Sequence, residues 1–430
     1  MRILVTGAGG FIGAAIVEAL DAAGHEVIAC LRPESDAAAG GIGHRQLVVD
    51  MREAVEPGAW RPLLAGIDAV VNCAGILREG REGDFARIHH DAPLALATAC
   101  REAGIGKFVQ VSALGDEAGG EFIASKHRFD AALLALGIPA TVIRPSVVTS
   151  ARGSHGGTSL LRGMAALPGV VFLPGRGDQR IQPVMREDLA GMVARCVAPE
   201  IAKGKVLHAV GPDVLTLREY LATVRRWLGF AEPVFVEAPS PLVRVAVGLG
   251  ERFGAGPLGA TIGAMLDRGN VAPPGAWEEA RDATGVATRA IAVAMGTSPS
   301  LVQDRWHARL HLLRPALRGV MAATWIASGA VGFAASPEAF APIANALGVP
   351  APQHAPLVLA ASALDVVLGA LLLTRWEGAA LALMAISVAA YTAALGVTSP
   401  ALWAEPAGGL LKNFALLGLV AVLAATRGRR

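Results

Sequence analysis

The sequence predicts an α/β domain with a doubly wound parallel sheet and a small substrate lobe, followed by an all-α domain of four transmembrane helices. Three observations carry this prediction. Residues 1–145 alternate short apolar runs with helix-length stretches, and a glycine-rich turn follows the first run. Residues 317–430 contain four long apolar stretches with very little charge. Strand–helix alternation is typical of a parallel sheet, and long apolar stretches are typical of membrane spans.

The expected strands are continuous apolar runs rather than alternating ones, which indicates a sheet that is covered on both faces. Helical patterns at 11–24 and 84–104 separate some of these runs. The runs are "ILVT" (3–6), "EVIACL" (26–31), "QLVVD" (46–50), "AVVNCA" (69–74), "KFVQVS" (107–112) and "TVIR" (141–144).

Residues 146–300 show a less regular pattern of strands and helices. They are expected to form a small lobe on the substrate side, together with the last elements of the sheet. They include a strand pattern, "VLHAV", and a helix pattern, "LTLREYLATVRRWLG". We therefore place the first domain at 1–300, a juxtamembrane amphipathic linker at 301–316 and the membrane domain at 317–430. Within 299–314, one side of a helix would be apolar and three arginines would stay solvated or meet phosphate headgroups. An ordinary packed surface helix is the alternative. The apolar residues are Leu301, Val302, Trp306, Leu310 and Leu313, and the arginines are Arg305, Arg309 and Arg314.

The four apolar stretches lie at about 317–335, 357–374, 378–397 and 408–426, each long enough to cross a hydrocarbon core of about 30 Å. Arginines flank the first stretch, the turn between the second and third, and the end of the fourth, whereas the other two loops have none. This alternation predicts a multi-pass protein of the inner (cytoplasmic) membrane with both ends in the cytoplasm. The N-terminus has no signal-peptide pattern. A large apolar helical core is the alternative. Asp365 would face the bundle interior, and Lys412 would extend toward the headgroups.

Composition excludes several classes of function. The chain is 53% hydrophobic and 17% charged, with a net charge of +2, so nothing indicates a nucleic-acid partner. Its four cysteines are far apart and form no CxxC pair, so we expect free buried thiols and no metal site. The lipid bilayer is the expected partner, together with a small lipophilic substrate or another membrane protein.

The segment "ILVTGAGGFIG" predicts a Rossmann-like nucleotide site, because it places glycines at intervals of three between a strand and a helix. Arg32, at the end of the second strand, favours the 2′-phosphate of NADP(H), although Glu34 keeps NAD(H) possible. Asp50 would bind the adenine, and the segment "VVNCAG" would pass the adenosine and its ribose. The expected cofactor-binding residues are Thr6, Gly7, Gly9, Gly10, Phe11, Ile12, Gly13, Arg32, Asp50, Asn72, Ala74, Gly75 and Lys126.

The segments "TGAGGFIG", "VSALG" and "SK" resemble the extended or atypical short-chain dehydrogenase/reductase superfamily over about residues 1–300. The resemblance is greatest to NmrA-like proteins and to the NADPH-binding accessory subunit of respiratory complex I. Residues 317–430 resemble DoxX-like four-helix membrane domains, mainly in topology.

The resemblance implies a catalytic trio of Ser, Tyr and Lys, which would fall on Ser112, position 122 and Lys126. Position 122 is Phe, however, and Phe has no ionisable proton. The chain has only two tyrosines, Tyr220 and Tyr391, which are not expected at this site. Lys126 is then expected to bind the cofactor ribose, and His89 and His90 are less favoured candidates for proton transfer. Asp188 is expected to begin a helix rather than act as an acid.

The leading hypothesis is a membrane-tethered NAD(P)(H)-binding oxidoreductase that acts on a lipophilic carbonyl or quinone-like substrate. The alternative is a non-catalytic NADPH-binding subunit with a structural or redox-sensing role in a membrane complex, which Phe122 favours. A third hypothesis makes the membrane bundle the functional part and the first domain its redox sensor. The sequence leaves open whether the protein has any turnover.

Overall fold

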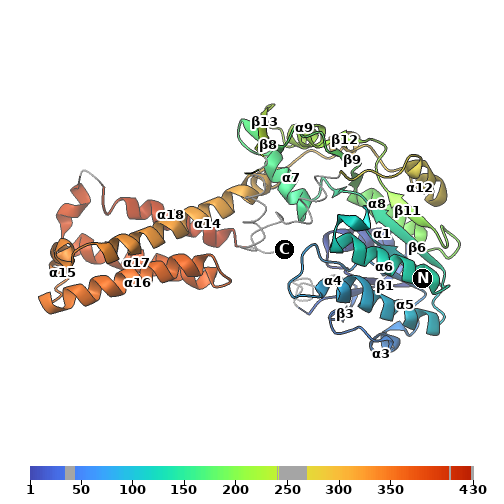
Figure 1. The fold of residues 1–430 in the computed structure, drawn as a ribbon, viewed down its shortest axis with the longest axis horizontal. Coiled ribbons are helices and arrows are strands. Elements are labelled where there is room, and N and C mark those ends of the chain that lie inside the picture. Colours follow the sequence, from blue (N-terminus) through green and yellow to red (C-terminus); the bar gives the residue numbers. More distant parts are fainter. Residues whose placement is uncertain (34–43, 240, 242–268, 406–407, 428–430) are drawn as a thin grey trace. The chain divides into compact units, whose positions relative to one another are not determined.

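The computed structural model describes residues 1–33, 44–239, 241, 269–405 and 408–427. The chain divides into two compact units, Met1–Arg309 and Leu310–Arg430, which we describe separately (Figure 1).

A seven-stranded sheet forms the centre of the first unit, in the order β11-β6-β5-β4-β1-β2-β3. Every neighbouring pair in it is parallel, so all the carboxyl ends of the strands lie at one edge. The strand order reverses beside β1, and this is where ligands bind in open α/β sheets. The strands are β1 (Arg2–Thr6), β2 (Glu26–Leu31), β3 (Arg45–Val48), β4 (Ala69–Asn72), β5 (Lys107–Val111), β6 (Ala140–Pro145) and β11 (Val206–Ala209).

Helices cover both faces of this sheet, as the apolar strands require. One apolar core packs the sheet against α1 (Phe11–Ala22), α8 (Arg186–Cys196) and α12 (Ala276–Thr284). A second core packs the other face against α3, α5 and α6. The helices of that face are α3 (Pro57–Trp60), η1 (Arg61–Leu64), α4 (Asp84–Ala86), the π-helix η2 (Arg87–Asp91), α5 (Ala92–Glu102), η3 (Glu117–Gly119) and α6 (Glu121–Ala135).

A smaller lobe has its own apolar core and three two-stranded sheets. The sheets pair β7 with β10, β9 with β12, and β8 with β13. The lobe contains β7 (Val148–Thr149), α7 (Gly157–Ala165), β8 (Val170–Pro174), β9 (Arg180–Ile181), β10 (Val184–Met185), β12 (Leu215–Thr216), α9 (Leu217–Trp227), β13 (Val234–Ala238) and α13 (Ile291–Gly296).

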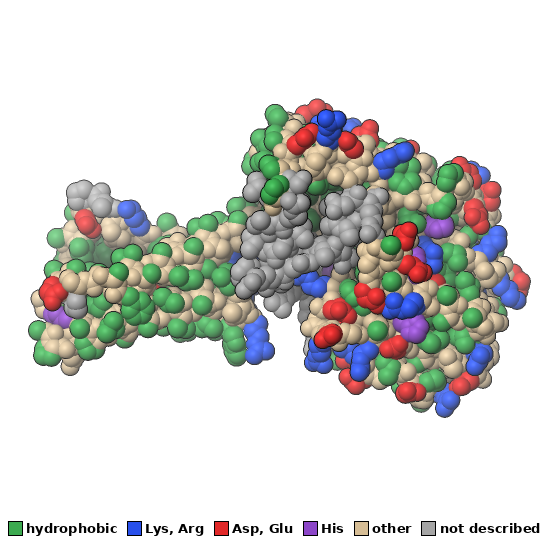
Figure 2. Space-filling model, in the orientation of Figure 1, with side chains coloured by type: hydrophobic (Ala, Val, Ile, Leu, Met, Phe, Trp, Pro, Cys, Tyr) green, Lys and Arg blue, Asp and Glu red, His purple; other side chains and the backbone are tan. Residues whose placement is uncertain are grey.

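The second unit is helical, and three helices of the described chain are long and apolar enough to cross a membrane. A fourth, α18, is apolar but shorter. The elements are α14 (Val302–Ala334), η4 (Pro337–Phe340), α15 (Ala341–Ala346), η5 (Ala351–Gln353), α16 (His354–Leu372), α17 (Glu377–Thr398), η6 (Pro400–Ala404) and α18 (Lys412–Ala425). Hydrophobic side chains cover the face of these helices seen in Figure 2, and charged side chains lie toward their ends.

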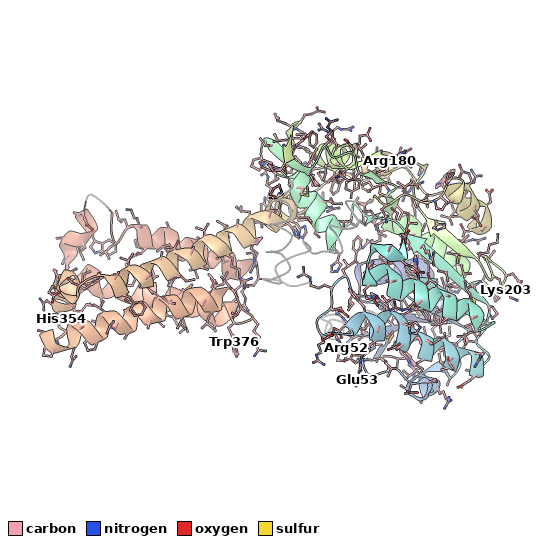
Figure 3. All side chains as sticks on the ribbon, in the orientation of Figure 1. Arg52, Glu53, Arg180, Lys203, His354 and Trp376 are labelled. Carbon is pink, nitrogen blue, oxygen red and sulfur yellow. The ribbon has the colours of Figure 1, made fainter. Side chains whose placement is uncertain are left out.

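Two arginines of α14 join the other helices of this second unit near one end of the bundle. Arg314 donates to Glu377 and to Thr426, 2.5 and 3.2 Å away, and so joins α14 to α17 and α18. Arg318 donates to the carbonyl oxygen of Leu372 at 2.7 Å, near the end of α16. Trp376 lies at this end of the helices and His354 at the other (Figure 3).

The predicted fold class, with its parallel sheet followed by apolar helices, is confirmed. Two details differ from the prediction. Helix α14 runs unbroken through Pro315, across the region that the sequence divides into a linker and a first span. Arg314 is engaged by Glu377 rather than solvated, and Arg309 lies over the ring of Phe230. The apolar side chains Leu301, Val302, Trp306 and Leu313 are between 49% and 62% exposed, whereas Leu310 is partly buried.

All four cysteines are free, and three of them are buried. Burial raises the pKa of both Cys30 and Cys100 to about 12, so these thiols are poor nucleophiles.

Candidate nucleotide and active site

The turn after β1 has the backbone form that a dinucleotide site needs. Gly7 has a φ of 67°, which favours glycine. A Cβ at Gly7 would lie 2.8 Å from both the Ala74 nitrogen and the Cys73 oxygen. The turn is therefore pressed against the segment that follows β4, and a larger residue would separate the two.

Gly13 holds α1 close to this turn. A Cβ on Gly13 would come within 2.1 Å of the Gly7 oxygen, so only glycine fits. Helix α1 begins at Phe11, and its N-cap residue, Gly10, offers no side-chain cap. Gly9 and Gly10 are exposed. Backbone N–H groups at an uncapped helix N-terminus suit a pyrophosphate, so these residues fit a dinucleotide cofactor.

Two arginines and a histidine lie near the same helix start. The Arg186 guanidinium lies 4.9 Å from the centroid of the Phe11 ring, and the His155 ring stacks on Phe11 at 6.4 Å. Burial and the nearby positive charge of Arg32 lower the pKa of His155. Arg32 is exposed, and no described acidic side chain pairs with it. A phosphate group would therefore find Arg32, His155 and Arg186 close to the turn. Glu34, the residue that would favour NAD(H), lies outside the described residues.

Two of the expected cofactor contacts have other partners. The Asn72 amide accepts a hydrogen bond from the Thr6 hydroxyl and donates to Gln110 at 2.7 Å, so it ties the ends of β1, β4 and β5 together. Asp50 lies just beyond β3 and accepts a hydrogen bond from the Arg52 amide at 2.9 Å. Asn72 thus shapes the sheet edge from within, whereas Asp50 keeps part of its carboxylate accessible.

Lys126 lies beside the segment that follows β4. Its Nζ donates to the Val111 oxygen at 3.3 Å, and a Cβ on Gly75 would lie 3.2 Å from that Nζ. Burial lowers the Lys126 pKa to about 8, against opposing effects of Asp130 and Cys73. The ammonium group is thus placed where the exposed Gly75 would admit a ribose.

Phe122 lies one helical turn before Lys126 and packs in an aromatic cluster. Its ring meets Phe85 at 6.1 Å and His89 at 5.5 Å, both edge to face. Ala113 and Ile123 complete this apolar group. The position of the family tyrosine is therefore dry and apolar, and it provides no hydroxyl.

His89 is held in the neutral state by its position in the π-helix η2. Its Nε2 accepts a hydrogen bond from the Ile76 amide at 3.0 Å, so Nδ1 carries the proton and contacts Ser125 Oγ at 3.0 Å. Burial, with the Lys126 charge, lowers the His89 pKa to about 2. His89 therefore positions the 73–76 segment and is unsuited to proton transfer near neutral pH. His90 is paired with Asp91 instead.

Ser112 does not direct its hydroxyl to this cluster. The Oγ donates to Asp130 Oδ2 at 2.8 Å, and the same oxygen accepts from Arg144 Nε at 2.9 Å. The next residue, Ala113, packs in the group that contains Phe122. Asp130 was missed from the sequence, although its place four residues after Lys126 puts both on one helix face.

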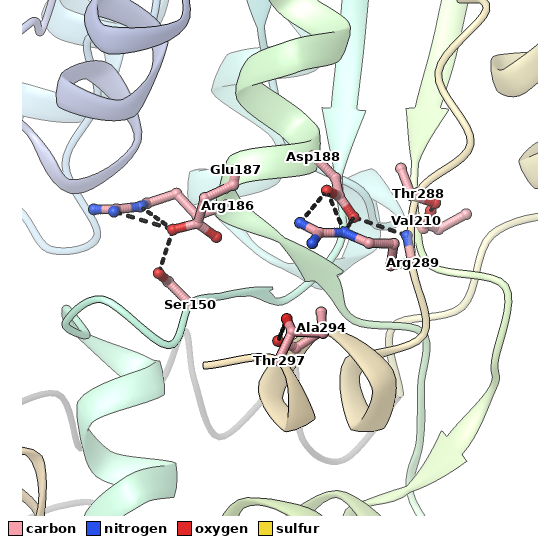
Figure 4. A network of polar contacts seen from close by, with 9 residues as sticks. All are labelled: Ser150, Arg186, Glu187, Asp188, Val210, Thr288, Arg289, Ala294 and Thr297. Atoms are coloured by element: carbon pink, nitrogen blue, oxygen red, sulfur yellow. Dashed lines mark hydrogen bonds and ion pairs between the residues drawn. The ribbon is translucent and has the colours of Figure 1, made fainter. Parts of the chain in front are cut away.

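Asp188 is confirmed as a helix-start residue. It lies in the first turn of α8 and binds Arg289 through contacts as short as 2.6 Å (Figure 4). The neighbouring Glu187 accepts from Ser150 at 2.6 Å and from Arg186 at 3.1 Å. Tyr220, the tyrosine of the first unit, is buried in the lobe and donates to Thr149 at 3.1 Å, so its hydroxyl does not serve the Lys126 site.

Both parts of the chain match known families. Residues 3–206 match the NAD dependent epimerase/dehydratase family, and residues 322–421 match the DoxX-like family. Relatives include proteins named divinyl chlorophyllide a 8-vinyl-reductase from rice (Oryza sativa subsp. indica) and maize (Zea mays). They are 31% and 29% identical, and each alignment covers 57% of this chain and 63% of the relative. The chain therefore spans less than two thirds of the length of these relatives.

Solved structures agree on the fold of the first unit. The crystal structure of gox2253 has a TM-score of 0.55 at 22% identity and covers 72% of this chain and 99% of that one. MoeE5 in complex with UDP-glucuronic acid and NAD has a TM-score of 0.52 at 17% identity, with 69% and 97% covered. At these identities the likeness establishes the fold alone. The nucleotide-binding fold and the helical second unit are thus supported independently.

Proposed function

We propose that this chain, which joins an extended short-chain dehydrogenase/reductase domain to a DoxX-like membrane domain, is a membrane-tethered NAD(P)(H)-dependent reductase of a lipid-soluble conjugated carbonyl compound, such as an enone or a quinone. One observation carries the proposal: Lys126 lies beside an apolar group of Phe85, Ala113 and Phe122, where the superfamily has a tyrosine. An apolar floor next to a single cation suits a hydrophobic substrate with one polar end.

The missing phenol restricts the chemistry. Reducing an isolated ketone develops an alkoxide, which needs a strong and well-placed proton donor. A conjugated carbonyl spreads the charge over an enolate or a hydroquinone oxygen, which is a much weaker base. The Lys126 ammonium, whose pKa is lowered to about 8, could protonate that weaker base near neutral pH. The bound nicotinamide would supply the hydride, and Lys126 would orient its ribose and deliver a proton to the substrate.

Two of the relatives agree with this choice of bond. Their names describe a vinyl reductase, which reduces a carbon–carbon double bond. This supports alkene-type reduction rather than sugar epimerisation.

The cofactor is proposed to be NADP(H) rather than NAD(H). Arg32 is exposed at the carboxyl end of β2, and its charge acts on His155 beside the glycine turn. Charge-assisted hydrogen bonds to a 2′-phosphate are the interaction for which an arginine is suited there.

The second unit is proposed to span the membrane four times with both ends in the cytoplasm, and 301–316 to act as the juxtamembrane linker. The contacts of Arg314 and Arg318 with Glu377, Thr426 and Leu372 gather one end of each of α16, α17 and α18 beside α14. Positive charge at a common end supports placing that end in the cytoplasm.

A second candidate function is a non-catalytic NADPH-binding subunit. It is favoured because the other polar side chains near Lys126 already have hydrogen-bond partners within the protein. Ser112 binds Asp130, and both ring nitrogens of His89 form hydrogen bonds. In that case Lys126 would only hold the cofactor.

The test uses the full chain in lipid nanodiscs. Binding of NADPH and NADH is measured by nicotinamide fluorescence, and turnover by loss of nicotinamide absorbance. The panel pairs lipophilic enones and quinones with saturated ketones of equal length. We expect oxidation with the conjugated members only, and its loss in Lys126→Met. NADPH binding without oxidation across the panel would reject the reductase and favour the second candidate.

A further inference from the structure

Two groups of hydrogen-bonded polar side chains lie among the apolar helices of the membrane unit. Ser328 on α14 donates to Asp365 Oδ2 on α16 at 2.8 Å. Tyr391 on α17 donates to Asn413 on α18 at 2.8 Å, and Asn413 donates to Thr392 at 2.8 Å. An electrostatic interaction couples Asp365 to Tyr391. Each of the four helices α14, α16, α17 and α18, whose ribbons are labelled in Figure 1, contributes at least one member.

Asp365 lies far from the charged ends of its helix. It is the only Asp, Glu, Lys or Arg in α16. At the helical rise it is roughly 10 Å from Leu372 and roughly 16 Å from His354. An ionised carboxylate at that depth in a hydrocarbon core is costly, so the neutral, protonated carboxyl is favoured.

The packing of α14 on α16 fixes the orientation of this carboxyl. A Cβ on Gly329 would lie 2.5 Å from the Ser362 oxygen, and one on Gly369 would lie 2.9 Å from the Ala322 oxygen. The two backbones thus touch on both sides of Asp365, as small residues permit between membrane helices. Ser328 occupies Oδ2 as a hydrogen-bond donor, which leaves the proton on Oδ1.

The remaining oxygen is unpaired and accessible. No side chain or backbone group among the described residues contacts Oδ1 of Asp365 by a hydrogen bond. Asp365 is only partly buried, and the neighbouring Tyr391 is 42% exposed. A hydrogen-bond donor that faces hydrocarbon has no water to satisfy it, and a purely structural role would not leave it open.

We propose that Asp365, oriented by Ser328 and bordered by Tyr391, is a binding site in the membrane unit for the carbonyl group of a lipid-soluble molecule. The protonated Oδ1 donates the hydrogen bond, and the apolar helix surfaces receive the rest of the ligand. This site is separate from the nucleotide site and does not depend on the proposed reductase activity.

The test measures protection of Asp365 from dicyclohexylcarbodiimide, a lipid-soluble reagent that adds to protonated carboxyl groups. Full-length protein in nanodiscs is treated at neutral pH, and the modified peptide is quantified by mass spectrometry. The probe is 2-undecanone, and undecane is the matched control without a carbonyl. We expect modification at Asp365, slowed about fivefold by the ketone, as one hydrogen bond allows, and unchanged by undecane.

Variants separate recognition from structure. Asp365→Asn should remove the modification while retaining the hydrogen bond from Ser328. Ser328→Ala frees the carboxyl to turn and should abolish the ketone protection, whereas Thr324→Val, which removes a hydroxyl bonded within α14, should not.

Four outcomes would overturn the proposal. The first is no modification of Asp365, and the second is equal protection by ketone and alkane. The third is a Ser328→Ala protein that unfolds more easily but keeps full ketone protection, because Ser328 would then be structural only. The fourth is protection without ketone that grows with protein density in the disc, because a second copy of the chain would then cover the site.

Discussion

The ring of Phe122 meets the imidazole of His89 edge to face, with their centroids 5.5 Å apart. This contact puts an aromatic hydrocarbon where a proton donor is expected. It also encloses a histidine whose nitrogens bind Ile76 and Ser125.

Replacing Phe122 with tyrosine tests whether the site lacks only a phenol. Phe122 is 9% exposed, so the added hydroxyl must find its space within the cluster, and we expect it to point toward Lys126. We expect Phe122→Tyr to bring turnover of saturated ketones that the parent protein lacks, by about tenfold or more over background, since general acid catalysis contributes at least that much. Phe85→Tyr is the matched control in the same cluster. A Phe122→Tyr protein that binds cofactor but still reduces no saturated ketone would contradict this expectation.

Arg32→Ala should remove the preference for NADPH. One charge-assisted interaction with a phosphate contributes about 1.5–3 kcal/mol, so NADPH affinity should fall about tenfold to hundredfold while NADH affinity stays nearly constant. Fluorescence titration of both cofactors measures this ratio. Arg101→Ala, at an exposed position on α5, controls for a general loss of positive charge. An Arg32→Ala protein with unchanged selectivity would place the phosphate contact elsewhere.

Gly13→Ala should abolish cofactor binding, although alanine is the better helix former by about 1 kcal/mol. The new methyl group would lie 2.1 Å from the Gly7 oxygen, which forces the turn away from α1. Gly58→Ala meets nothing within 4 Å and serves as the control. Cofactor titration and the thermal midpoint give the readout. Wild-type affinity in Gly13→Ala would show that the turn tolerates separation from the helix.

His89 should make the first unit sensitive to acid. Its pKa is lowered to about 2, from 6.5, because burial disfavours the charged imidazole. Below pH 6.5, His89 therefore binds a proton in the unfolded chain but stays neutral in the folded chain. Stability falls as the pH falls below 6.5, by about 1.4 kcal/mol for each pH unit.

The measurement for His89 is the thermal midpoint between pH 7 and pH 5, where His89→Asn should show a flatter dependence than the parent. His90→Gln is the control, because that neighbouring histidine is partly exposed. Parallel pH curves for the parent and His89→Asn would contradict the assignment.

Arg314→Gln should loosen the membrane unit. Its guanidinium joins Glu377 and Thr426 at partly buried positions, so its loss should cost about 2 kcal/mol. Thermal unfolding in nanodiscs checks this, with Arg375→Gln as the control, because Arg375 is exposed. Equal midpoints for the two variants would mean that the Arg314 contacts contribute little.

The sheet and the glycine turn could be predicted because their signals are local. Continuous apolar runs and a glycine spacing of three report directly on strands and on a close approach of the backbone. The hydrogen-bond partner of Ser112 could not be predicted, because Asp130 lies 18 residues later in the sequence, on helix α6. Whether Ser112 or Ala113 faces Phe122 depends on how β5 ends, and residue type alone does not specify this.

The neutral state of His89 also could not be predicted from the sequence. It depends on the burial of the ring and on the nearby Lys126 charge, and the pattern at 84–104 shows neither. The continuity of α14 was missed for a related reason. Pro315 and the change of polarity near 317 resemble a boundary, but packing against neighbouring helices tolerates a proline within a membrane helix.

The arginine contacts of the membrane unit impose an order on its biogenesis. Arg314 leaves the ribosome 63 residues before Glu377 and 112 residues before Thr426. During synthesis α14 therefore forms while the Arg314 guanidinium group lacks both partners. The full set of contacts can form only after α18 has been synthesised. A chain that is truncated or arrested before α18 keeps an arginine without its Thr426 partner, which distinguishes it from the finished protein.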